Sequence, residues 1–500
     1  MALVILIIYA VSIGFIFLYS LIQLSLIVSY LRSKSKKKEE ITELLPSEYP
    51  LVTIQLPVYN ELYVVERLIE CICNFDYPKD KLEIQVLDDS TDETVELIAQ
   101  RVHFYQLEGF DIKQVRRKER TGFKAGALKY GTEICKGEFI AIFDADFLPS
   151  PDFLKKTLPH FKDEKVGLVQ TKWSYTNSDY SFLTQIQAFG LNAHFTIEQV
   201  GREYNNHFIN FNGTAGIWRK KAIETSGGWQ PDTLTEDLDL SYRAQLNDWK
   251  FKYLEEVDSP SELPVEINAL KTQQFRWTKG AAECVRKSLW KVISSGKSFR
   301  TKVHATFHLM NSSVFIFIFL LTALSLPLIM IKPLYEEYKF IFQLSMVFAV
   351  SWVILGFFYW VSFTYGRENK WQLLKEFVWK FPVFLAVSMG LSLHNAIAVF
   401  EGYIGKKSPF VRTPKFNINS KKDQWEGNKY NIKKIGLMTY LEGGFLLYIL
   451  QSIYVSIVYK DFGILPFLIF LAIGYSIVFI NSLFHWNRAA KSYRYDHQVS

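Results

Sequence analysis

The stretch FIAIFDAD, residues 139–146, decides how the middle of this 500-residue chain folds. An apolar run, residues 139–143, has the length of a buried strand, and two carboxylates, Asp144 and Asp146, come directly after it. Residues i and i+2 of an extended chain lie on the same face, so both carboxylates can address one ligand. The pattern therefore predicts a strand whose carboxyl end opens onto a binding site.

Similar apolar runs lie on both sides of this stretch and alternate with polar, helix-like segments. They are Leu51–Leu56, Glu83–Leu87, Asp111–Val115, Phe139–Phe143 and Val166–Gln170. Alternation of strands and helices is typical of an α/β domain with a mainly parallel sheet. We place this domain at residues 45–300, with a nucleotide-binding, Rossmann-like arrangement.

Long apolar segments flank the predicted domain. The first, Leu3–Tyr30, is long enough to span a bilayer, and a basic cluster between Arg32 and Lys38 follows it, which puts that side in the cytosol. Beyond the domain lie five further apolar runs: His308–Ile331, Phe340–Tyr365, Phe377–Phe400, Ile435–Tyr459 and Leu465–Phe484. The chain is therefore expected to be a multi-pass membrane protein.

The run Phe377–Phe400 can be interpreted in two ways. As a span, it would put the basic loop between Lys406 and Lys434 outside the cytosol, against the positive-inside rule. It also contains polar residues such as Lys380 and His394. We therefore predict a cytosolic interface helix here and five spans in total, with six as the alternative.

This topology divides the chain into six parts. They are a membrane helix at 1–31, the cytosolic domain at 45–300, a helix pair at 305–366, an interface helix and loop at 371–434, a second helix pair at 435–486 and a cytosolic tail at 487–500. The formal net charge of +7 fits basic cytosolic loops beside anionic lipid. We find no basic helix interleaved with aromatic residues, so nucleic acid is not an expected partner.

A second strand-end site precedes the first by about 55 residues along the chain. In QVLDDSTD, residues 85–92, Asp88 and Asp89 stand at the carboxyl end of an apolar run. That edge of an open parallel sheet is where ligands bind. Mg²⁺ or Mn²⁺ is usually held by one or two carboxylates together with phosphate oxygens, so Asp144 and Asp146 are candidate metal ligands beside a nucleotide diphosphate.

Two further tracts could supply the remaining chemistry. In TEDLD, residues 235–239, a carboxylate could take the proton of an attacking hydroxyl; we choose Asp237, with Glu236 beside it. In QQFRW, residues 273–277, Arg276 could clamp phosphate, Trp277 could stack on a sugar ring, and glutamine could bind hydroxyls. An amphipathic helix resting on the membrane would explain the second tract equally well.

These four sites, in this order, resemble those of the processive membrane family-2 glycosyltransferases, which include cellulose synthase and hyaluronan synthase. The closer resemblance is to the cellulose-synthase-like A and C groups, the mannan and glucan synthases, and to their bacterial relatives. It rests on QVLDDSTD (85–92), GFKAGAL (122–128), FDADF (143–147), FNGTAGIWR (211–219) and GGW (227–229). The resemblance implies a nucleotide-sugar-binding (GT-A) fold for the α/β domain.

The resemblance also implies roles for single residues. A nucleotide-sugar site would comprise Asp88, Asp89, Lys124, Asp144, Asp146 and Arg276, with Asp146 the more direct metal ligand. Acceptor binding would involve Gln273, Trp277, Asn212 and Gly213, and catalysis would use Asp237 and Glu236. The tract FVRTPK (410–415) resembles a gating loop, so Phe410, Thr413 and Lys415 would close over the nucleotide; Arg412 departs from the usual valine.

We therefore expect an inverting hexosyltransferase that uses UDP-glucose or GDP-mannose with Mg²⁺ or Mn²⁺. Its product would be a β-glycan, β-1,4-linked, that passes through the membrane spans of the same chain. The alternative is transfer of one sugar to a membrane lipid, as in ceramide glucosyltransferase-like enzymes. A transporter or inactive scaffold is disfavoured, because none of the expected carboxylates is missing. The expected location is a bacterial inner membrane, with the Golgi membrane as the alternative.

Overall fold

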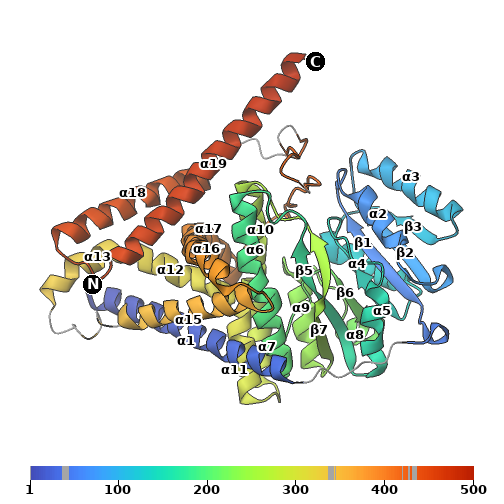
Figure 1. Cartoon of the computed structure of the whole chain (residues 1–500), viewed down its shortest axis with the longest axis horizontal. Helices are drawn as coiled ribbons and strands as arrows, with labels where there is room; N and C mark the ends of the chain where they lie inside the picture. Colours follow the sequence, from blue (N-terminus) through green and yellow to red (C-terminus); the bar gives the residue numbers. More distant parts are fainter. Residues whose placement is uncertain are drawn as a thin grey trace.

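The computed structural model describes residues 2–36, 44–335, 340, 343, 345–418, 420–425, 428–430 and 436–499. An α/β domain occupies one side of the molecule and a bundle of apolar helices the other (Figure 1). Helices α6 (Phe182–Ala193) and α10 (Ile267–Ser294) stand between the two parts. The polar middle of the sequence and the apolar segments on both sides of it thus form separate parts of the molecule.

The α/β domain is built on a seven-stranded sheet with the order β3-β2-β1-β4-β6-β5-β7. The strands are β1 (Val52–Val58), β2 (Leu82–Asp88), β3 (Asp111–Val115), β4 (Phe139–Ile142), β5 (Val166–Tyr175), β6 (Gly216–Arg219) and β7 (Lys250–Ser261). Only β6 runs antiparallel to its neighbours. The predicted α/β class with a mainly parallel sheet is therefore confirmed.

All five predicted strands exist, and two strands were missed. β6 has only four residues, and β7 contains Glu255, Glu256 and Asp258, which hide its apolar character. Helices cover both faces of the sheet (Figure 1). Those of the domain are α2 (Val65–Cys73), α3 (Thr94–Leu107), α4 (Phe123–Ile134), α5 (Phe153–Thr157), α7 (Gln199–Tyr204), α8 (Lys220–Thr225) and α9 (Glu236–Leu246).

The helices outside the domain follow the apolar runs of the sequence. They are α1 (Ala2–Ser35), α11 (Phe299–Leu309), α12 (Val314–Ala323), α13 (Ser325–Ile331), α15 (Ser345–Thr364), α16 (Lys370–Gly390), α17 (Ser392–Ile404), α18 (Leu437–Val458) and α19 (Leu465–Val499). In the described part of the chain, α1, α18 and residues 465–487 of α19 are long and apolar enough to cross a membrane. Two bent pairs, α11–α12 and α16–α17, raise that number to as many as five.

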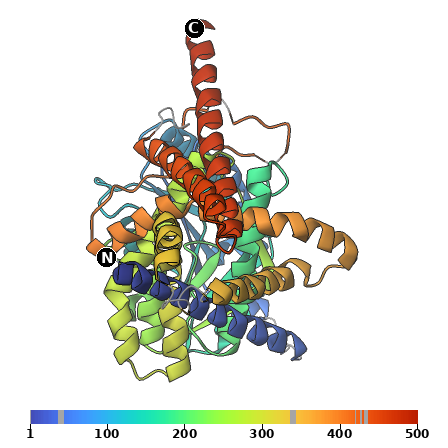
Figure 2. The ribbon, with the colours of Figure 1, turned by 90° about the vertical axis from the view of Figure 1, so that its left-hand side faces the viewer.

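The ambiguous run Phe377–Phe400 forms most of the bent pair α16–α17, whose two helices meet at 51°. Both helices point roughly toward the viewer in Figure 1, crosswise to α1 and α18, and α16 is seen along its length in Figure 2. The interface helix and the division into five spans stay predictions. Parts of the predicted segments fall outside the described residues, namely 341–342, 344 and 431–435.

Candidate active site

A cavity of about 190 Å³ opens at the carboxyl edge of the sheet, beyond the ends of β1, β2 and β4. Its wall also includes the first turns of α4 and α9, one face of α10 and the loop 410–415. Every predicted site residue except Asp88 lines it: Asp89, Lys124, Asp144, Asp146, Asn212, Gly213, Glu236, Asp237, Gln273, Arg276, Trp277, Phe410, Thr413 and Lys415. Segments up to 326 residues apart in sequence therefore meet at one place.

The two aspartates at the end of β2 have different surroundings. Asp88 is buried and accepts hydrogen bonds from Ser90 N at 2.9 Å and Gln114 Nε2 at 2.8 Å. Asp89 lines the cavity and forms an ion pair with Arg117, whose Nε lies 3.1 Å from Asp89 Oδ1. Asp88 does not line the cavity, and its side chain braces the turn that presents Asp89; its expected contact with the nucleotide stays a prediction.

Each carboxylate of the Asp-x-Asp tract is paired with a lysine. Lys124 Nζ lies 2.5 Å from Asp144 Oδ1 and donates to the Gly213 carbonyl at 2.9 Å. Lys415 Nζ lies 2.7 Å from Asp146 Oδ2. Burial alone would lower the pKa of Lys124, but Asp144 and the nearby acidic groups raise it above its ordinary value. The cavity therefore holds matched charges in close contact, which can exchange for those of a charged ligand.

These two carboxylates can hold a divalent cation only with help from a ligand. In the described residues, no group of three or more His, Cys, Asp or Glu side chains is placed to bind a metal ion. Mg²⁺ and Mn²⁺ often take only one or two protein carboxylates and complete their coordination with substrate phosphates. Asp144 and Asp146 fit that kind of site.

The candidate base lies at the start of α9. Asp237 accepts a hydrogen bond from its neighbour Leu238 N at 2.8 Å, and Thr235 makes no side-chain cap for the helix. Burial, reinforced by the neighbouring charge of Glu236, raises the pKa of Asp237 to about 7. A carboxylate with such a pKa can accept a proton near neutral pH far better than an ordinary aspartate.

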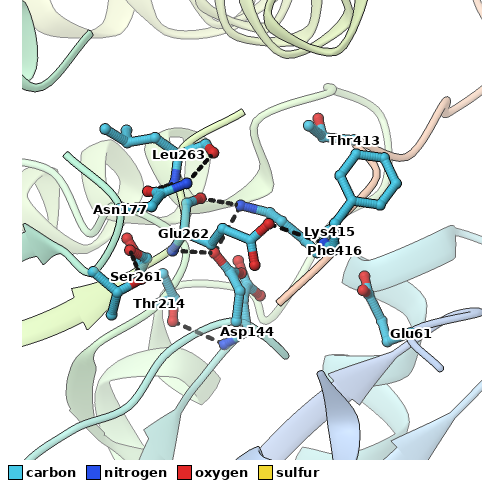
Figure 3. Close-up of polar contacts among 12 residues, drawn as sticks. Glu61, Asp144, Asn177, Thr214, Ser261, Glu262, Leu263, Thr413, Lys415 and Phe416 are labelled. Atoms are coloured by element: carbon cyan, nitrogen blue, oxygen red, sulfur yellow. Dashed lines mark hydrogen bonds and ion pairs between the residues drawn. The ribbon is translucent and has the colours of Figure 1, made fainter. Parts of the chain in front are cut away.

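The loop 410–415 forms part of the cavity wall, and Figure 3 shows its residue Lys415 beside Glu262. Arg276 Nη2 on α10 donates to Thr413 Oγ1 at 3.0 Å, and its guanidinium lies 4.8 Å from the centre of the Phe410 ring. Phe410 in turn stacks on Phe123 with ring centroids 5.6 Å apart. The predicted gating residues therefore contact the predicted phosphate-binding residues directly.

Residues 50–280 match the family model described as "Glycosyltransferase like family 2". The match covers slightly less than half of the chain. Two rice proteins (Oryza sativa subsp. japonica) are similar to the chain: probable glucomannan 4-beta-mannosyltransferase 2 is 42% identical over 277 residues, and probable glucomannan 4-beta-mannosyltransferase 7 is 45% identical over 251 residues. The alignments cover 54% and 49% of this chain, and 47% and 43% of the rice proteins. The chain thus spans less than half the length of these relatives.

A solved structure has the same fold. Mannosyltransferase PcManGT from Pyrobaculum calidifontis, solved in complex with GDP-Man and Mn²⁺, superposes with a TM-score of 0.53 and 18% sequence identity. The superposition covers 80% of this chain and all of that protein. The likeness therefore extends beyond the glycosyltransferase family 2 segment into the helical part.

Sequence reasoning missed several residues around the site of the α/β domain. Glu61, just beyond β1, is half-buried, and Arg412 Nε lies 2.9 Å from its Oε1. Burial raises the pKa of Glu61 to about 8. Glu262, just beyond β7, accepts hydrogen bonds from Phe416 N at 2.9 Å and Asn417 N at 2.8 Å, while Lys415 Nζ donates to its carbonyl at 2.6 Å (Figure 3). Both glutamates follow the end of a strand. A search for acidic residues after each strand would have found Glu61 after β1, and Glu262 once β7 had been recognised.

A second cavity, of about 400 Å³, adjoins the first, and we call it the inner cavity. The candidate base Asp237 lines both cavities. The other residues that line both are Trp173, Leu191, Asn212, Thr235, Gln273 and Trp277. From there the inner cavity extends among α6, α15, α16 and α17 toward the apolar bundle. Asp237 therefore lies at the place where the two cavities adjoin.

Proposed function

We propose that the chain transfers hexose units, with inversion, from a nucleotide sugar to the end of a growing β-glycan. The observation that carries this proposal is the position of Asp237 between the two cavities. The first cavity offers cations for a diphosphate, and the inner cavity offers aromatic rings and amides for a sugar chain. A donor and an acceptor can thus approach the same buried carboxylate from opposite sides.

The chemistry follows from the groups in the wall of the first cavity. Asp237 accepts the proton of the acceptor hydroxyl while the hydroxyl oxygen attacks the anomeric carbon. The bond from that carbon to the diphosphate breaks, and its electron pair leaves with the diphosphate oxygen. Lys124 and Arg276 stabilise the negative charge that develops on this leaving group. Attack from the face opposite the diphosphate turns an α-linked donor into a β-linked product.

A divalent cation would be held by Asp146 and Asp144 together with the diphosphate oxygens. When bound, Mg²⁺ or Mn²⁺ would offset the charge of the departing diphosphate. Lys415 contacts Asp146 directly, so the lysine and the cation compete for the same carboxylate. The Mn²⁺ in the similar archaeal mannosyltransferase supports the choice of cation.

The relatives favour mannose over glucose as the transferred sugar. The rice proteins are named glucomannan 4-beta-mannosyltransferases, and the archaeal structure contains GDP-Man. We therefore propose GDP-mannose as the preferred donor and a β-1,4-linked mannan-type backbone as the product. The inner cavity, which leads from Asp237 toward the bundle, would carry the product into the membrane.

The same topology implies a location. The apolar helices are those of a multi-pass membrane protein, and we propose that the catalytic domain faces the cytosol. Our expectation of a bacterial inner membrane receives no support from the rice relatives, which favour the Golgi alternative. Localisation of a tagged full chain in a plant cell would separate the two.

A donor screen on the purified full chain tests this proposal. Radiolabelled GDP-mannose, UDP-glucose and UDP-N-acetylglucosamine are supplied in turn with Mn²⁺ or Mg²⁺, and the product is analysed for size and linkage. We expect an alcohol-insoluble polymer from GDP-mannose that a β-1,4-mannanase degrades. Label that partitions only into organic solvent would instead indicate transfer to a lipid, and no transfer from any donor would overturn the proposal.

A further inference from the structure

A π-helical turn lies between α6 and α7, at the point where the chain passes the inner cavity. This turn, η4 (His194–Glu198), continues both helices without a break in backbone direction. It brings the first and last side chains of the turn together, with His194 Nδ1 2.9 Å from Glu198 Oε2. Single π-helical turns inside α-helices occur frequently at functional sites.

Residues of two helices, α7 and α1, hold the carboxylate of Glu198 in place. Arg202 Nη1 lies 3.1 Å from its Oε2, and Gln23 Nε2 on α1 donates to its Oε1 at 3.1 Å. Burial alone would raise the pKa of Glu198, but Arg202 and then His194 hold it well below its ordinary value. Glu198 is therefore an ionised acceptor, and His194 donates to it through Nδ1.

The other nitrogen of His194 reaches the active site. His194 Nε2 lies 3.1 Å from Asn212 Oδ1, which also accepts a hydrogen bond from Asn210 Nδ2 at 2.8 Å. His194 lines the inner cavity, whereas Asn212 lines both cavities. The imidazole therefore bridges the π-helical turn and the residue that stands where the two cavities meet.

Asn212 begins a short turn, residues 212–214, that contacts three groups of the proposed mechanism. The carbonyl of Gly213 accepts a hydrogen bond from Lys124 Nζ at 2.9 Å, and Thr214 Oγ1 accepts one from Asp144 N at 2.9 Å. Gly213 has a φ of +81°, and a Cβ at this position would lie 3.0 Å from Asp237 Oδ2. A shift of this turn would therefore change the space around the base as well as the cation pairs.

We propose that His194 is a positioning residue that fixes the 212–214 turn, and with it the acceptor side of the active site. The polar chain that holds it runs from Gln23 on α1 through Glu198 to His194 and ends at Asn212. Through this chain, the first membrane helix supports the geometry in which the acceptor hydroxyl meets Asp237. This role rests on the proposed function, since it concerns the acceptor of the same transfer reaction.

The test compares His194→Phe with wild type in transfer to a short β-mannan oligosaccharide of defined length. Phenylalanine keeps the shape of the ring and removes both hydrogen bonds. We expect kcat/KM for the oligosaccharide to fall by about 30- to 100-fold, because small misplacements at a reacting centre can cost that much. The KM for the nucleotide sugar and the melting temperature should stay near the wild-type values.

Two further variants separate positioning from folding. His194→Gln keeps an amide that can hydrogen-bond to the Asn212 side chain and should recover most of the lost acceptor kcat/KM. Thr196→Val changes the same π-helical turn but removes only a hydrogen bond to the Asn192 carbonyl at 2.7 Å and a contact to Ser362 Oγ on α15 at 2.8 Å. Neither partner lines the active-site cavity, so this variant should behave like wild type.

The outcomes are distinct. Equal losses for donor and acceptor, with a lower melting temperature in His194→Phe, would mean a purely structural role and would overturn the inference. An unchanged acceptor kcat/KM would do the same while leaving the proposed function intact. A wild-type protein that transfers to no oligosaccharide, from any donor, would overturn both.

Discussion

The two walls of the active-site cavity are held in different ways. The wall at the sheet edge is fixed by backbone hydrogen bonds, such as those from Phe143 N to Gln55 O at 3.1 Å and from Ala215 N to Ile142 O at 2.8 Å. The opposite wall is the loop 410–415, within residues 406–418, which are described in full and form no helix or strand. Arg412 and Lys415 hold this loop against the first wall through ion pairs with acidic residues.

The two walls therefore suit different tasks. Reacting groups need a fixed geometry, and the sheet edge provides it for Asp144, Asp146 and the turn before Asp237. In the proposed reaction a donor must enter and its nucleotide must leave, so we expect the loop 410–415 to move. Ion pairs suit that purpose, because a charged ligand can take over either partner, whereas apolar packing has no such substitute.

We expect the largest loss of activity when the candidate base Asp237, which belongs to the fixed wall, is replaced. Asp237→Asn keeps the shape of the side chain and removes its ability to accept a proton. We expect kcat to fall by about 10³-fold, within the range for a general base. Initial rates of polymer formation measure this effect. Asp232→Asn is the matched control, since Asp232 is exposed, pairs with Lys287 and lies outside the cavity.

The pH dependence provides a second test of the same wall. Burial and Glu236 raise the pKa of Asp237 to about 7, and only the ionised form can accept a proton. The value of kcat/KM should therefore rise with pH up to about 7 and then level off, so that the rate near pH 5 is about a hundredfold below the plateau. A flat profile across this range would contradict the assignment of Asp237.

The movable wall should respond more moderately. Lys415→Ala removes the ion pair with Asp146 and the hydrogen bond to the Glu262 carbonyl. We expect kcat/KM for the donor to fall about tenfold, or about 1.4 kcal/mol, close to the lower limit for one hydrogen bond to a charged group. Lys407→Ala, at an exposed position near the same loop, should have no effect. A loss as large as that of Asp237→Asn would make Lys415 part of the fixed chemistry and contradict the comparison.

Arg412 should give the smallest effect. The side chains of Arg412 and Glu61 are only 14% and 13% exposed, but burial raises the pKa of Glu61 to about 8, which limits the charge left behind when Arg412 is removed. We therefore expect a contribution of about 1 kcal/mol. Arg412→Leu should therefore raise the KM for the donor by about three- to fivefold without changing kcat. Val411→Ala, at an exposed neighbour, is the control. If the KM of Arg412→Leu does not change, the ion pair has no part in closing the loop.

The strands and the main acidic groups could be predicted because their signals are local. An apolar run followed by aspartates, as in residues 139–146, contains both the strand and the site at its end. Sequence does not tell which of the adjacent Asp88 and Asp89 faces the cavity, and in the structure Asp89 does while Asp88 is buried. The pattern of an apolar run followed by acidic residues was not sought at Glu61 and Glu262, which lie beyond β1 and the less apolar β7.

The long-range contacts could not be predicted from the pattern of residues. The contact of Arg276 with Thr413 joins residues 137 positions apart, and the contact of Gln23 with Glu198 joins residues 175 positions apart. Nothing near His194 in the sequence indicates that a π-helical turn places it between Glu198 and Asn212. Such contacts depend on how α1 and the loop pack on the domain, which is a property of the whole fold.

The central claim is that the product leaves Asp237 through the inner cavity. Ser388 on α16 lines this cavity but not the first one. Ser388→Trp should block the path, so that GDP-mannose yields only short β-linked oligosaccharides at an unchanged donor KM, while wild type yields polymer. The measurement is the length distribution of the radiolabelled product. Polymer of wild-type length from the folded Ser388→Trp protein would contradict the account.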